Sequence, residues 1–255
     1  MKHITRLILI SLGLMIASVQ ASAAILAFDN FDYADGSLVP NGGWATHSGT
    51  AGDLLVSGGQ VVVQHGTPSE DANIEFTGVA GDIYYGLDFT VNASGMIIGT
   101  DNEYFAHFRV ADSFDFSARL DVVSATSGGD FTVGIASDDS TADAIWGTDL
   151  DFGVTYRAVV KYDQVNNIAT LWIDALFASD TSIVGDDRAD PGDMVNSFAL
   201  RQSDSDLNET VLVDNLVIGS TFDDVVRGAS PIPVPAAIWL FASALGLLGF
   251  KGRKA

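Results

Sequence analysis

Carboxylates are the most abundant chemically active side chains of this chain, so acid–base catalysis by a carboxylate pair is the first chemistry to consider. Two carboxylates held about 5 to 5.5 Å apart on one face of a strand can cleave a glycosidic bond with retention of configuration. The chain has four glutamates: Glu70, Glu75, Glu103 and Glu209. Close aspartate pairs, such as Asp149 with Asp151 or Asp204 with Asp206, lie beside turns rather than within strands. We therefore expect no catalytic carboxylate pair.

Nucleophiles and metal-binding side chains are equally sparse. The chain has no cysteine, which excludes disulfides, thiolate metal sites and cysteine nucleophiles. Serine is plentiful, but no Gly-x-Ser-x-Gly elbow is present. Three histidines, His47, His65 and His107, lie outside the N-terminal tail, and their spacing matches no zinc pattern. We expect His107 to be a hydrogen-bonded structural residue of a strand.

Aromatic side chains offer a different chemistry, because the apolar face of a sugar can stack on an exposed ring. Trp44, Trp146 and Trp172 are the candidates within the central region. Core packing is the competing interpretation for each of them, since buried aromatic side chains dominate sandwich cores. Trp146 is the least core-like of the three because it lies in the loop 143–148. Trp146 and Trp44 are therefore the candidate glycan platform.

The charge of the chain is concentrated between its two ends. The net charge is −21, yet five of the twelve basic residues and none of the 33 acidic residues lie in the terminal segments 1–24 and 229–255. The region between them keeps seven basic residues, which gives it a net charge of −26. Such a region repels phosphate backbones and lacks a clustered Lys/Arg footprint. Nucleic acid is therefore not an expected partner.

Short apolar segments separated by turn-forming residues predict the fold. In segment 168–174 the even-numbered residues share one face and the odd-numbered residues the other, which is the period of a strand. No segment shows the 3.6-residue apolar repeat of a helix. We predict an all-β domain over residues 24–228, a two-sheet antiparallel sandwich of jelly-roll type. The predicted strands are 61–63, 83–91, 104–110, 116–123, 131–135, 156–162, 168–173, 198–201 and 211–218.

Residues 1–23 have the order of a secretory signal peptide. Two basic residues precede the apolar run 7–19, and Ala21 and Ala23 form a small-residue cleavage box, with cleavage expected after Ala23. An uncleaved membrane anchor is the alternative. The apolar run is, however, shorter than the roughly 20 residues that span a bilayer. We predict an N-terminal signal helix that is removed on export.

The C-terminal tail, residues 229–255, has three parts. A proline-rich segment comes first, and because proline cannot continue a strand or a helix interior, this segment is a stiff spacer. The apolar run 236–250 is the predicted transmembrane helix, which reaches only about 22 Å. The basic end 251–255 stays in the cytoplasm by the positive-inside rule. The domain would then face outward. The proline-rich motif consists of Pro231, Ile232, Pro233, Val234, Pro235 and Ala236.

This tripartite ending resembles the PEP-CTERM family of sorting signals, in the variant whose motif reads Val-Pro-Leu-Pro-Ala. The matching residues are 232–236, Ile-Pro-Val-Pro-Ala, and no glutamate stands between the prolines. The resemblance implies recognition in the inner membrane by an exosortase-type protease and removal of the tail. The domain would then be released or attached at the cell surface, often alongside exopolysaccharide. An ordinary single-pass tail anchor is the alternative.

The central domain resembles the concanavalin A-like, laminin-G-like jelly rolls found attached to such tails. The resemblance rests on the opening segments 31–38 and 41–44, the hairpin of 156–162 with 170–173, and the closing segment 213–219. Many members of that family bind carbohydrate and some cleave it. Its catalytic members carry Glu-x-Asp-x-x-Glu, or a close relative, on a strand. No glutamate of this chain begins such a motif.

The same resemblance implies a structural calcium ion, the one cofactor we consider. Some jelly rolls of this kind hold calcium between their first and last strands, and calcium prefers carboxylate and carbonyl oxygens. Asp214, together with Asp29 and a nearby carbonyl, would form that site. Solvated or turn-capping aspartates are the alternative.

These features together predict an exported cell-surface or extracellular-matrix protein. Its domain would serve as a non-catalytic structural or glycan-binding module, and exopolysaccharide and the processing protease would be its partners. A divergent polysaccharide-active hydrolase of the same fold is the alternative.

Overall fold

The computed structural model describes residues 24–66, 68–93, 103–187, 190–202 and 209–228. The predicted signal peptide, with Ala21 and Ala23, and the predicted sorting tail 229–255 lie outside these residues. Within the described part of the chain, no helix combines the length and the apolar character needed to cross a membrane.

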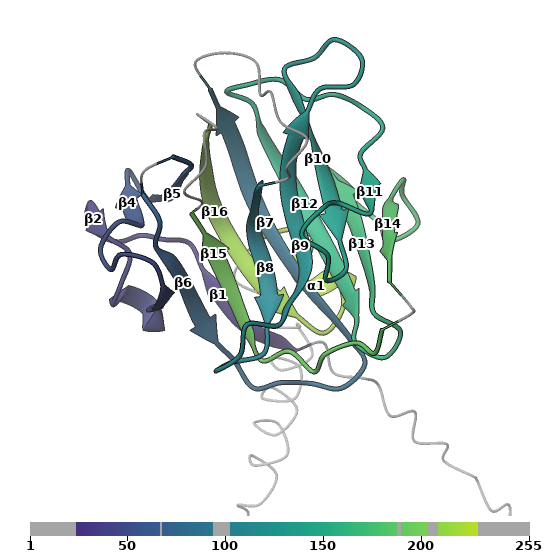
Figure 1. Cartoon of the computed structure of the whole chain (residues 1–255), viewed down its shortest axis with the longest axis horizontal. Helices are drawn as coiled ribbons and strands as arrows, with labels where there is room; N and C mark the ends of the chain where they lie inside the picture. The colour runs from purple at the N-terminus through teal and green to yellow at the C-terminus, as the bar shows by residue number, and fades with distance from the viewer. Residues whose placement is uncertain (1–23, 67, 94–102, 188–189, 203–208, 229–255) are drawn as a thin grey trace, which may run out of the picture.

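Two antiparallel sheets pack face to face to form the domain (Figure 1), which confirms the predicted all-β sandwich. In spatial order, the nine-stranded sheet contains β14 (Ile183–Asp186), β13 (Ile168–Ile173), β12 (Thr155–Asp163), β7 (Asp82–Asn92), β16 (Thr210–Gly219), β5 (Gln60–Gln64), β4 (Leu55–Ser57) and β2 (Gly36–Ser37), with β1 (Ile25–Asp29) paired to the second half of β16. The seven-stranded sheet contains β11 (Ala144–Ile145), β10 (Phe131–Ala136), β9 (Phe116–Ser124), β8 (Glu103–Arg109), β15 (Ser197–Arg201), β6 (Asp71–Glu75) and β3 (Ala45–Ser48).

All nine predicted strands are present, and their ends agree with the prediction to within one residue. The other strands of the described chain carry little local signal, because most of them are short or polar. β6, for example, has the sequence Asp-Ala-Asn-Ile-Glu and becomes a strand by pairing with β15 on one side and β3 on the other. Tertiary pairing of this kind routinely overrides local β propensity.

Aromatic side chains dominate the core between the sheets. Tyr85 on β7 meets Phe108 on β8 and Phe198 on β15 edge to face, with ring centroids 5.0 Å apart in both pairs. The Tyr85 hydroxyl donates to the carbonyl of Ala118 at 2.9 Å, so the polar end of this buried ring is satisfied. This group of rings joins the two sheets, which have no disulfide to connect them.

A short helix, α1 (Phe222–Val225), covers part of the outer face of the nine-stranded sheet. The Trp172 ring packs edge to face on Phe222, with centroids 5.2 Å apart, in a small cluster that includes Val159 and Val217. Trp172 is therefore only 5% exposed, and its ring has no open face for a sugar. β13 is buried on both faces for the same reason.

Arg157 on β12 fixes α1 to the sheet. Its Nη1 donates to Asp88 Oδ1 at 2.9 Å and to the carbonyl of Asn215 at 2.8 Å, and its Nη2 donates to the carbonyl of Val225 at 2.6 Å. Asp88 Oδ2 also accepts from the side-chain amide of Asn215 at 2.8 Å. Burial lowers the pKa of Arg157, and the Asp88 carboxylate opposes this shift. One guanidinium thus connects β7, β16 and the C-terminal end of α1.

Substitution of Arg157 by Met tests this connection. We expect the free energy of unfolding to fall by about 3 kcal/mol, because the change leaves Asp88 half-buried without its counter-ion. Lys161→Met is the matched control, since the Lys161–Asp82 pair is longer, at 3.5 Å, and more exposed, so its loss should cost less than about 1 kcal/mol. Urea unfolding at pH 7 measures both variants. Equal losses in the two variants would contradict the assigned role of Arg157.

Candidate functional site

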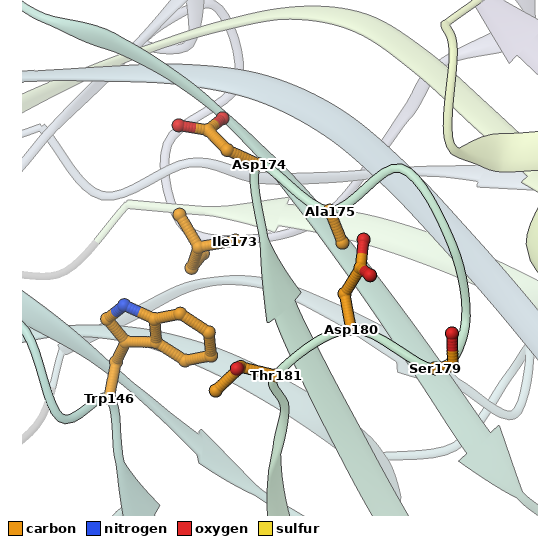
Figure 2. A pocket seen from close by; sticks show the side chains of 7 residues that line it. All are labelled: Trp146, Ile173, Asp174, Ala175, Ser179, Asp180 and Thr181. Atoms are coloured by element: carbon orange, nitrogen blue, oxygen red, sulfur yellow. The ribbon is translucent and has the colours of Figure 1, made fainter.

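A pocket of about 470 Å³ lies at the edge of the sandwich, where strands of the two sheets end together. Trp146 follows β11 of the seven-stranded sheet, whereas the rest of the lining comes from the end of β13 and the loop that leads to β14. The pocket therefore takes one wall from each sheet. Its lining residues are Trp146, Ile173, Asp174, Ala175, Ser179, Asp180 and Thr181 (Figure 2).

Backbone hydrogen bonds hold Trp146 in place. Its N–H donates to the carbonyl of Val133 at 2.8 Å, and its carbonyl accepts from the Thr132 hydroxyl at 3.0 Å. The indole is half-buried and packs against the core. Part of the ring thus remains accessible while its position is fixed by β10. The expectation that Trp146 is the least core-like tryptophan of the domain is confirmed.

Asp174 and Asp180 place carboxylates on the side of the pocket away from the indole (Figure 2). Asp174 has a positive φ of 51°, and its Oδ1 accepts from the Arg157 backbone N–H at 2.8 Å, which fixes its position at the end of β13. Asp180 Oδ2 accepts from the backbone N–H groups of Leu176 and Phe177, at 2.8 and 2.9 Å. Asp174 thus uses one oxygen to bond the neighbouring strand β12, and Asp180 uses one oxygen to shape its own loop. Within the described chain the structure gives no bond to the second oxygen of either group.

This arrangement combines two kinds of surface in one pocket. The indole of Trp146 and the side chain of Ile173 form an apolar wall, and the hydroxyls of Ser179 and Thr181 add polar groups beside the two carboxylates. A sugar ring has the matching chemistry, because its C–H face is apolar and its hydroxyl groups donate hydrogen bonds. A sugar that stacked on the indole and also donated hydrogen bonds to a carboxylate would be held in one orientation.

Trp44 is buried and cannot stack on a sugar, so its inclusion in the glycan platform is wrong. The ring is 2% exposed and packs against Phe31 and Phe198 in the core. Its indole N–H donates to Asp29 Oδ2 at 2.8 Å. The physical reason is that this hydrogen bond satisfies the polar atom of tryptophan, so the whole side chain can be buried.

Asp29 is a buried hydrogen-bond acceptor at the end of β1. Besides Trp44, its carboxylate accepts from the Phe31 backbone N–H at 2.8 Å and from the Tyr33 hydroxyl at 2.9 Å. Burial and the Asp29 carboxylate together raise the pKa of Tyr33 to about 12. Three protein donors therefore already surround the group that was predicted to bind calcium.

Asp214 lies on β16 at a bulge, where the strand changes its register against β7. Its Oδ1 accepts from the backbone N–H of Asn215 at 2.6 Å, and Asp29 is paired with Leu216 on the same strand. Burial raises the pKa of Asp214, and the negative charges of Asp88 and Asp32 add to this shift. The structure thus puts Asp29 and Asp214 near one bulge, and calcium binding there stays a prediction.

A different group of carboxylates has the tighter geometry for a hard cation. Within the described residues, carboxylate oxygens of Asp138, Asp139 and Asp187 all lie within 4.8 Å of one another. The buried side-chain amide of Asn167 donates to Asp138 Oδ2 at 3.0 Å. The sequence analysis missed this group because two connections far apart in sequence contribute to it, one after β10 and one after β14, and only the run Asp138–Asp139 gave a local signal.

The three histidines of the described chain are partly or fully buried. His107 is fully buried, with Nδ1 3.0 Å from the carbonyl of Phe108, which confirms the expectation for this residue. Burial lowers the pKa of His47 and of His65 to about 4 in each case, and nearby arginine charges add to the shift. All three rings are therefore neutral at pH 7.

No protein-family description matches the chain, and no curated protein matches it by sequence. Solved structures do match. A Lotus tetragonolobus seed lectin is 12% identical, with a TM-score of 0.49, and the match covers 77% of this chain and 98% of the lectin. A sialidase is 13% identical, with a TM-score of 0.50, and covers 79% of this chain. The match spans only 19% of the sialidase. These similarities concern the fold alone, which is a two-sheet antiparallel β-sandwich.

The acidic group provides a pH test. A hydrogen bond with Asp138, aided by desolvation and by the charges of Asp138, Asp190 and Asp139, raises the pKa of Asp187 from 3.8 to about 6. The folded state then binds more protons than the unfolded state between these values, so stability falls as the pH rises through about 6. Asp187→Asn should raise the melting temperature at pH 7 and have little effect at pH 4.

Thermal unfolding from pH 4 to pH 7 measures this difference. Asp223→Asn is the control, because Asp223 is an exposed carboxylate on α1, away from the acidic group. A shift for Asp187→Asn that is the same at both ends of the pH range would show that Asp187 and Asp138 do not share a proton.

Proposed function

We propose that this chain is an exported, non-catalytic glycan-binding module of the cell surface or extracellular matrix. The single observation that carries the binding function is the pocket in which the Trp146 indole faces carboxylates and hydroxyls from the other sheet. The jelly-roll fold is compatible with this role, but fold alone does not define a function.

Pre-organisation of the pocket supports binding. The Trp146 backbone is bonded to β10, Asp174 is bonded to β12, and Asp180 is bonded within its own loop. A sugar that enters the pocket therefore has little protein motion to arrest, which lowers the entropic cost of binding. Ile145, Leu176 and Phe177 lie within two residues of the lining in sequence. Each is about half exposed or more and adds apolar surface for a longer glycan.

The two ends of the chain support the proposed location. The signal peptide would direct export, and the proline-rich motif 231–236 with its apolar run and basic end would present the precursor to an exosortase-type protease. Exopolysaccharide at the cell surface would then be the available glycan. Intact mass spectrometry of the exported protein tests both cuts at once: we expect loss of residues 1–23 and of the segment beyond about Pro233. A mass that still includes residues 1–23 would contradict the signal peptide. A mass that still includes the segment beyond Pro233 would contradict removal of the tail.

Substitution of Trp146 tests the pocket. On a printed array of neutral and acidic glycans, Trp146→Ala should weaken binding of the pocket ligand by about tenfold or more, because truncation of a central aromatic residue costs about 2 kcal/mol. Trp146→Phe keeps a ring and should retain most of the affinity. Phe28→Ala is the control, since Phe28 is an exposed aromatic residue on β1.

Two results would overturn the proposal. Equal binding by the Trp146→Ala variant and the unmodified protein would exclude the pocket. Release of shorter saccharides from a polysaccharide, abolished by Asp174→Asn or Asp180→Asn, would show that the domain is a hydrolase.

A further inference from the structure

The outer face of the seven-stranded sheet carries a second group of chemically active side chains. Tyr104 on β8 lies between Arg119 on the neighbouring strand β9 and Arg201 on the other neighbour, β15. These three strands run side by side in the sheet (Figure 1). The residues next to them in sequence, Phe105, Leu120 and Leu200, belong to the core. Tyr104, Arg119 and Arg201 therefore point away from the core, and we call their surface the Tyr104 face.

Both guanidinium groups lie over the one ring. The Arg119 Cζ lies 4.9 Å from the centroid of the Tyr104 ring, and the Arg201 Cζ lies 4.3 Å from it. Arg119 Nε also donates to the carbonyl of Phe116 at 3.2 Å. A guanidinium held over an aromatic ring loses part of its freedom to move, and the N–H groups at the edge of its plane can bind a carboxylate bidentately.

This concentration of positive charge is unusual for the domain. Arg109, Arg119 and Arg201 lie on this one sheet, whereas the region between the terminal segments has seven basic residues against 33 acidic ones. Asp71 and Asp121 are on the same face, but both are buried, and Asp71 accepts from the Ser48 hydroxyl at 2.7 Å. The arginines 119 and 201 are only half-buried. These carboxylates offset part of the arginine charge. Because they are buried, the charged groups that reach the surface at this point are the two guanidiniums.

Aromatic rings continue from Tyr104 along the face. His107 lies 5.4 Å from Tyr104 and 4.5 Å from Phe116, measured between ring centroids. Phe116 in turn contacts Phe114, whose side chain is 76% exposed, with centroids 6.2 Å apart. The result is a row of rings that begins at the two arginines and ends at a ring open to solvent.

We propose that the Tyr104 face binds an acidic polysaccharide, with Arg119 and Arg201 receiving the carboxylate of a uronate residue and Phe116 and Phe114 stacking on neighbouring sugar rings. The combination of fixed guanidinium forks with an aromatic row matches a polymer that carries both a carboxylate and an apolar ring face. This site is separate from the Trp146 pocket and does not depend on it.

Other polyanions match the face less well. An acidic peptide has carboxylates but no ring faces to stack on Phe114. Nucleic acid carries a phosphate at every nucleotide, so it would meet the acidic remainder of the surface along its whole length. A polymer with one carboxylate on each sugar ring has fewer charges and uses both parts of the face.

Binding of the purified exported protein to polygalacturonate at 150 mM salt tests the proposal. Arg119→Gln and Arg201→Gln should each weaken binding by about tenfold or more, because each removes a charge-assisted, bidentate contact. Phe114→Ser, which changes an exposed residue and leaves the core intact, should weaken it several-fold. Arg227→Gln is the matched control, since Arg227 is exposed and lies beyond α1 on the nine-stranded sheet. It should bind like the unmodified protein.

The polymer panel decides what the face recognises. We expect strong binding to polygalacturonate and none to dextran. Polyglutamate or dextran sulfate that bound as tightly as polygalacturonate would overturn the proposal, because charge alone would then be sufficient. An equal loss in Arg227→Gln would overturn it as well. Should an arginine variant fail to fold, as judged by its thermal unfolding, the Phe114→Ser result decides.

The two proposed sites can fail independently. Trp146→Ala should leave polygalacturonate binding unchanged, and Arg201→Gln should leave binding of the pocket ligand unchanged. Loss of polygalacturonate binding in Trp146→Ala would assign the polymer to the pocket and contradict a site on the Tyr104 face.

Discussion

Apolar burial has to hold the two sheets together without any covalent cross-link, because the chain has no cysteine. The edge-to-face rings of Tyr85, Phe108 and Phe198 supply that contact at the centre of the sandwich. The nine-stranded sheet also buries apolar side chains on its outer face, because α1 covers part of that face and Arg157 bonds the helix to the sheet. The two proposed binding sites lie elsewhere, at the edge of the sandwich and on the outer face of the seven-stranded sheet.

The sequence was sufficient to predict the architecture and the longest strands. Runs such as 83–91 and 211–218 are long, apolar and bounded by turn residues, so their local pattern agrees with their final environment. Strands such as β6 and β14 could not be predicted, because a polar or glycine-containing segment becomes a strand only when a neighbour supplies its hydrogen bonds. Helix α1, with four residues, is too short to give a periodic signal.

The sites were harder to predict than the fold, for a related reason. Trp146 could be selected from its loop position, but its partners Asp174 and Asp180 lie beyond two further strands in sequence. Trp44 was misjudged because its burial depends on a hydrogen bond to Asp29, fifteen residues away. The Tyr104 face combines side chains from three strands that are separated by up to 97 residues in sequence. Only the order of strands in the sheet shows that they meet.

Electrostatics has to explain how an acidic domain could bind an acidic polymer. The region between the terminal segments has a net charge of −26, so an acidic polymer is repelled at long range. At physiological ionic strength this repulsion is screened beyond about 8 Å, whereas a carboxylate in contact with a guanidinium is screened much less. Attraction at the Tyr104 face can therefore prevail only at contact, where Arg119 and Arg201 are held on the ring. An acidic domain with a few fixed arginines would then disfavour indiscriminate binding of polyanions and select a polymer whose shape brings its carboxylate to that point.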